Sequence, residues 1–183
     1  MPSFFFCFSN EYDEVSTAVF PFAADFLAFY RQIQKINANI PEEFSVLLKR
    51  LLTDILAKMK YDETMNWGEE GELTDEAEFE DVRKKLKLLQ DMVGGIDNAL
   101  LVETLYNVIN NAFDKLVQTG PNGMDWRELD VALYELNVFG DLAFQNGYLF
   151  VKTADGLVPN GDAAARLVAM VIKMMNSSTS MFH

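Results

Sequence analysis

Basic side chains recur along stretches of this 183-residue chain whose apolar spacing indicates the second helix of a helix pair. They are Lys49, Arg50, Lys58, Lys115, Arg166 and Lys173. Ammonium and guanidinium groups attract phosphate oxygens, and clusters of them mark nucleic-acid binding surfaces. If their helices line one concave face, these six residues form a diffuse basic strip. The alternative is scattered, solvated surface cations, which is the usual state of Lys and Arg.

Acidic side chains are concentrated in one stretch, which we define as the acidic loop, residues 61–75, together with the helix start that follows it. Residues 61–81 hold ten acids and no base, which accounts for most of the net charge of −13. The usual interpretation of such a stretch is a solvated insertion; the sharper hypothesis is that Glu69, Glu70 and Glu72 contact a basic partner surface. The stretch lacks the ligand spacing and the glycine of an EF-hand, so no metal is expected.

The residue types that enzymes use are nearly absent. The one histidine is His183, the last residue, and the one cysteine is Cys7, which we expect to be a buried, inert thiol. No nucleotide-binding glycine motif, nucleophile elbow or zinc-binding HExxH is present. The sequence therefore predicts a protein that is not an enzyme and has no cofactor.

Helical spacing of apolar residues covers almost the whole chain, with one strand-like run at residues 148–152. We expect a kink at Pro21 and a helix end at Gly94-Gly95. Six helices are predicted, at residues 13–35, 41–60, 76–93, 98–118, 126–144 and 160–176. We expect an all-α fold, an α-solenoid of about three HEAT-like antiparallel helix pairs in a single segment, residues 1–183. A compact six-helix bundle would give the same patterns.

Both ends of the chain are apolar, at residues 4–8 and 174–182. A solenoid normally ends in repeats with a polar outer face. We therefore expect exposed apolar surface at both ends, and a chain that is a fragment of a longer protein. No stretch approaches the roughly 18 apolar residues of a membrane span, so membrane insertion is not expected.

Three segments carry a resemblance to one family. They are FSNEYDEVSTAVFPFAADFLAFYR at residues 8–31, VRKKLKLLQDMVGGID at residues 82–97 and DWRELDVALYELNVFGD at residues 125–141. In this order they resemble the middle region of fungal exportin-T, a karyopherin of the importin-β superfamily that carries tRNA out of the nucleus. The closing STSMFH is similar to the start of a further family segment.

The resemblance implies HEAT-like helix pairs and cooperative binding of tRNA and GTP-bound Ran in the nucleus. It also implies contact with nuclear pore proteins during shuttling between nucleus and cytoplasm, and release of tRNA in the cytoplasm after GTP hydrolysis. Recognition of RNA shape and backbone suits a diffuse basic strip. A complete exportin is several times longer, and its N-terminal Ran-binding region has no counterpart here, so the chain would be a structural slice of the receptor. The alternative is a HEAT- or armadillo-type scaffold with an unrelated partner.

Overall fold

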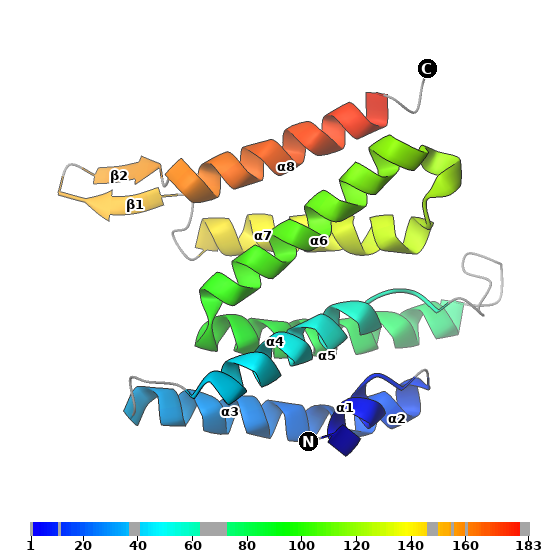
Figure 1. Cartoon of the computed structure of the whole chain (residues 1–183), viewed down its shortest axis with the longest axis vertical. Coiled ribbons are helices and arrows are strands. Elements are labelled where there is room, and N and C mark those ends of the chain that lie inside the picture. The colour runs from blue at the N-terminus through cyan, green and yellow to red at the C-terminus, as the bar shows by residue number, and fades with distance from the viewer. Residues whose placement is uncertain are drawn as a thin grey trace. The chain divides into compact units, whose positions relative to one another are not determined.

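The chain forms helices in two compact units, residues 1–101 and 102–183, in a computed structural model (Figure 1). The structure describes residues 2–10, 12–36, 41–62, 73–145, 150–154, 156–159 and 161–179. Its helices are α1 (Pro2–Phe8), α2 (Asp13–Ala18), α3 (Phe20–Ile36), α4 (Glu42–Lys58), α5 (Leu73–Ile96), α6 (Asn98–Thr119), α7 (Trp126–Gln145) and α8 (Gly161–Thr179), with a 3-10 turn at Pro121–Gly123. The predicted fold class, all-α with HEAT-like helix pairs, is confirmed; a single segment over residues 1–183 stays a prediction.

In the first unit, α3 and α5 pack along each other and α4 packs on α5. Phe44 of α4 lies against the rings of Phe26 and Tyr30 of α3. The core is aliphatic, with side chains that bury one face of each helix. They include Leu27, Leu48, Leu51, Leu52, Ile55, Met59, Leu86, Leu89 and Val93. Apolar area removed from water on these faces is what holds the helices together.

Pro21 divides the first expected helix in two. A single helix over residues 13–35 with a kink is wrong: α2 ends at Ala18, and α3 begins at Phe20. Pro21 therefore lies in the first turn of α3, where the N–H that proline lacks has no intrahelical partner to lose.

Gly94 and Gly95 do not end the third expected helix, because α5 runs through them to Ile96. A Cβ at Gly94 would lie 2.5 Å from Leu101 Cδ2, and a Cβ at Gly95 would lie 3.6 Å from the Arg31 guanidinium carbon. Gly94 therefore allows the close approach of Leu101, the fourth residue of α6, whereas a Cβ at Gly95 would make only an ordinary contact with Arg31. The same helix begins at Leu73, three residues earlier than expected.

The N-terminal aromatic segment is more buried than expected. Phe5 and Phe8 are buried, and Phe8 packs against Phe20 at a ring distance of 5.3 Å. Phe6 alone of these three is well exposed, at 75%. The expected exposed surface at residues 4–8 is thus wrong for the two residues that α1 turns inward. At the other end Met175 is exposed, and residues 180–183 lie outside the described residues.

In the second unit, α8 packs on both α7 and α6. The expected apolar face of α7 (Trp126, Leu129, Leu133, Leu136 and Leu142) differs in register from the buried face, and the side chain of Leu142 lies outside the described residues. Its buried residues are Val131, Ala132, Glu135, Val138 and Phe139, whereas Trp126 and Leu133 are exposed. The helix is apolar on two sides: Leu133 and Leu136 line an open groove of about 340 Å³ with Leu167 and Val171 of α8.

A short hairpin precedes α8. Strand β1 (Phe150–Thr153) pairs antiparallel with β2 (Gly156–Pro159), with Phe150 opposite Pro159 and Thr153 opposite Gly156. The strand-like run at residues 148–152 is therefore confirmed for its last three residues, and the others lie outside the described residues. Gly156 has φ +123°, a backbone conformation that L side chains rarely adopt.

Candidate RNA-facing cations

The three candidate cations of the first unit all lie on α4, but their surroundings differ. Lys49 is exposed. Arg50 lies over the Phe5 ring at 4.4 Å, with its Nε 3.8 Å from Asp54 Oδ2. Its aromatic contact fixes the guanidinium group while more than half of the side chain stays exposed.

Lys58 is largely buried and holds the end of α4 against the segment before α2. Its Nζ donates to the Asn10 carbonyl oxygen at 2.9 Å and to Asp13 Oδ1 at 2.7 Å. A phosphate group would have to break both contacts to reach this ammonium. Lys58 is therefore the least accessible of the three candidates on α4, whereas Lys49 and Arg50 are exposed.

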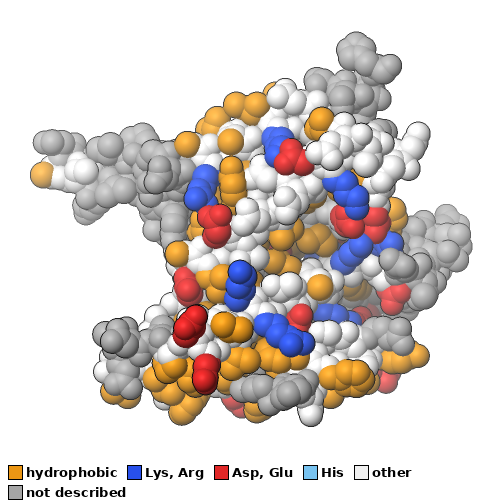
Figure 2. All heavy atoms as spheres, in the orientation of Figure 1, with side chains coloured by type: hydrophobic (Ala, Val, Ile, Leu, Met, Phe, Trp, Pro, Cys, Tyr) orange, Lys and Arg blue, Asp and Glu red, His pale blue; other side chains and the backbone are white. Residues whose placement is uncertain are grey.

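Arg166 and Lys173 lie on the face of α8 that meets α6. Arg166 Nη1 donates to Glu103 Oε2 at 2.7 Å, and its guanidinium lies over the Tyr106 ring at 4.9 Å. Lys173 Nζ is 2.6 Å from Asp114 Oδ1 and donates to Asn110 Oδ1 at 3.1 Å. We name the four charged residues, Glu103, Asp114, Arg166 and Lys173, the α6–α8 seam. Basic and acidic side chains lie next to one another over these two helices (Figure 2).

Contacts between α6 and α8 show that the two helices run in the same direction. The hydrogen bonds that join Arg166 to Glu103 of the seam and Lys173 to the neighbouring Asn110 both span 63 residues. A constant separation means that α6 and α8 run parallel and in register, because an antiparallel pair would change its separation along the contact. Met170 and Ser177, one turn after each cation, are buried on the same side of α8.

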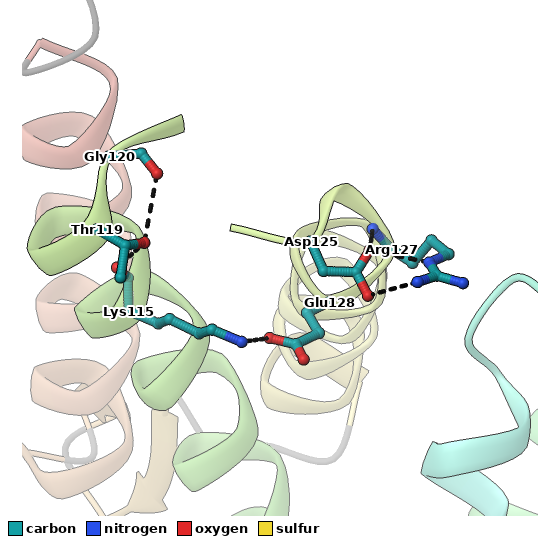
Figure 3. A network of polar contacts seen from close by, with 6 residues as sticks. All are labelled: Lys115, Thr119, Gly120, Asp125, Arg127 and Glu128. Carbon is teal, nitrogen blue, oxygen red and sulfur yellow. Dashed lines mark hydrogen bonds and ion pairs between the residues drawn. The ribbon is translucent and has the colours of Figure 1, made fainter. Parts of the chain in front are cut away.

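Lys115 is also paired with a carboxylate. Its Nζ donates to Glu128 Oε2 at 2.6 Å, which links α6 to α7 across the intervening turn (Figure 3). Within that turn Gly120 has φ +67°, and Asp125 Oδ1 accepts from the backbone N–H of Arg127 at 3.0 Å, as an N-cap does.

The structure thus places Arg166 and Lys173 together on α8 and Lys49 and Arg50 together on α4. The three candidates in the second unit, Lys115, Arg166 and Lys173, each contact a carboxylate. Sequence reasoning found these cations but missed their acidic partners. The expected partner-protein contacts Glu69, Glu70 and Glu72 lie outside the described residues. Among the described residues there is no cluster of potential metal ligands and no helix long and apolar enough to cross a membrane.

The Arg166 guanidinium holds the pKa of the Glu103 carboxyl below its ordinary value, first through their hydrogen bond and then through charge attraction. A depressed pKa in the folded state means that the stabilisation is present above the unfolded pKa and is lost as the pH falls through the folded pKa. We expect Arg166→Gln to return the Glu103 pKa toward its ordinary value in an NMR titration of the side-chain carboxyl.

Lys173→Gln is the matched control, because Lys173 contacts Asp114 rather than Glu103. It removes the same charge from α8 and should leave the Glu103 titration almost unchanged. Titration of Glu103 at its ordinary value in the unaltered chain would contradict the described ion pair.

Paired helices with buried aliphatic faces define a helical-repeat protein of the HEAT-like class. The family model for Exportin-T matches residues 1–183. Exportin-T of Aspergillus niger is 44% identical over 175 residues, which cover 96% of this chain and 16% of that protein. Exportin-T of Chaetomium globosum is 44% identical over 183 residues, the whole of this chain and 17% of that protein.

The chain belongs to the exportin-T family. A further relative, Exportin-T of Neosartorya fischeri, is 43% identical and is likewise covered to 16% of its length. The chain therefore spans about one sixth of the curated relatives that it matches. The resemblance to this family that the three sequence segments carry is confirmed.

Proposed function

We propose that this chain is a structural slice of a nuclear export receptor for tRNA, which binds tRNA cooperatively with GTP-bound Ran and releases it in the cytoplasm. The observation that carries the proposal is the match of the Exportin-T family model over residues 1–183. The receptor shuttles between nucleus and cytoplasm, contacts nuclear pore proteins on the way and acts by binding rather than by catalysis.

Within this slice, the helix pairs hold the shape of the receptor and offer basic side chains to the RNA backbone. Lys49 and Arg50 are the strongest candidates, because both are exposed on α4. The proposed set also includes Lys58, Lys115, Arg166 and Lys173, and each of these forms an ion pair with a carboxylate that phosphate must displace. Glu69, Glu70 and Glu72 are proposed to face a basic partner protein.

An electrophoretic mobility assay with the full-length protein and tRNA, with and without GTP-loaded Ran, tests the proposal. Coupling between two ligands of one protein is typically about 5- to 150-fold. We expect GTP-loaded Ran to raise tRNA affinity by a factor in this range and GDP-loaded Ran to leave it unchanged. No gain with GTP-loaded Ran would overturn the proposal and favour a scaffold with an unrelated partner.

A further inference from the structure

The α6–α8 seam presents its two cations in a partly accessible state. The Arg166 side chain is 38% exposed and that of Lys173 is 27% exposed. Their carboxylate partners are more open to solvent, at 55% for Glu103 and 52% for Asp114. Ion pairs of such exposure are weak and are screened by salt, so another anion can compete for the cations.

The aromatic contact of Arg166 distinguishes it from an ordinary surface cation. The Tyr106 ring lies 4.9 Å from the guanidinium carbon, so it supports the flat group independently of Glu103. Displacement of the carboxylate does not remove this ring contact, which still restricts the orientation of the guanidinium. A planar group held in this way suits a phosphate group, which accepts two parallel N–H donors.

We propose that the α6–α8 seam is an intramolecular competitor of RNA phosphate. Glu103 and Asp114 occupy Arg166 and Lys173 in the free protein, and the backbone of tRNA binds these cations only by displacing the two carboxylates. The inference rests on the proposed function and adds its regulation: the seam lowers the affinity for RNA in general, so that phosphate contacts form here only when other contacts already hold the RNA.

The test uses the full-length protein with GTP-loaded Ran and measures tRNA affinity by fluorescence anisotropy at two salt concentrations. Glu103→Gln keeps the size of the side chain and removes its charge. One cation released to phosphate steepens the salt dependence by about 0.7 to 0.9 in the logarithmic slope. We therefore expect about a threefold gain in affinity near 50 mM salt that almost disappears near 200 mM.

Two matched variants separate release of Arg166 from a general loss of negative charge. Asp141→Asn removes one charge from an exposed position of α7 in the same unit and should give a much smaller gain. Arg166→Gln combined with Glu103→Gln should abolish the gain, because the released cation is then missing. A gain equal to that of Asp141→Asn, or one that persists without Arg166, would overturn the proposal.

The two proposals fail in different ways. If the unaltered protein binds tRNA with GTP-loaded Ran but Glu103→Gln changes neither affinity nor salt slope, the seam is purely structural and the export proposal stands. If neither protein binds tRNA, the export proposal itself is overturned and the competitor proposal falls with it. Circular dichroism of each variant confirms that the helices are retained.

Discussion

Replacement of Leu86 by Ala is expected to lower the free energy of unfolding by about 2 to 5 kcal/mol, the usual cost of truncating a buried leucine. Leu86 is fully buried on α5, the helix against which both α3 and α4 pack. The substitution removes apolar contacts and leaves a cavity that these helices fill only in part. Urea unfolding followed by circular dichroism measures the change.

Leu88→Ala is the matched control, because it makes the same chemical change two residues away on the same helix. Leu88 is 64% exposed, and a surface substitution of this kind usually changes stability by less than about 0.5 kcal/mol. Equal losses from the two variants would contradict the described orientation of α5.

The second large effect is expected at Arg83, a buried arginine that closes the C-terminal end of α4. Its Nε and Nη2 donate to the Met59 carbonyl oxygen at 3.2 and 2.8 Å. The guanidinium also lies near the rings of Tyr61 and Phe79, at 5.0 and 5.2 Å. Arg83→Met keeps the apolar stem and leaves a buried carbonyl without these donors, which costs about 1 to 3 kcal/mol.

Arg83→Lys tests whether the positive charge alone is enough for this stabilisation. An ammonium group keeps the charge but lacks the planar fork that donates to the Met59 carbonyl and lies over the two rings, so we expect Arg83→Lys to recover only part of the loss. Lys84→Met, on the exposed side of the same helix, should change stability little, because Lys84 contacts only the exposed Asp81 among its described partners. Full stability of Arg83→Met in urea unfolding would show that the Met59 carbonyl does not need these donors.

Helix positions followed from local sequence, because apolar residues at steps of three and four mark any helix with one buried face. The predictions that were wrong, the end of α5 and the buried face of α7, rest on residue types that occur in more than one structural setting. Gly94 and Gly95 are typical of a helix end, but here α5 runs through both, and Gly94 allows Leu101 to approach this helix. The leucines of α7 indicated its core face, yet the smaller Val131 and Ala132 are the buried residues.

The candidate site could be predicted only by residue type. The sequence placed Arg166 and Lys173 in a loose set of basic residues on second helices of the expected pairs, but their carboxylate partners lie 63 and 59 residues earlier in the chain. Such a separation depends on the register between α6 and α8, which periodicity within one helix does not determine. A search for acids one repeat before each cation could have found Glu103 and Asp114.

The burial of Arg83 also could not be predicted from local sequence. Arg83 lies in the basic run of residues 83–87, a pattern that is typical of a solvated helix face. Three of its neighbours in that run, Lys84, Lys85 and Lys87, are at least partly exposed, whereas Arg83 is turned toward Met59 and buried. Only the position of α4 relative to α5 distinguishes this residue from the others.

The central claim, that this chain is part of a carrier whose RNA and GTPase sites are coupled, is tested most directly by reciprocity. Coupling between two ligands changes both affinities by the same factor. We predict that saturating tRNA raises the affinity of the full-length protein for GTP-loaded Ran by the factor with which Ran raises its affinity for tRNA. An affinity for GTP-loaded Ran that does not change with tRNA, measured by isothermal titration calorimetry, would contradict the claim.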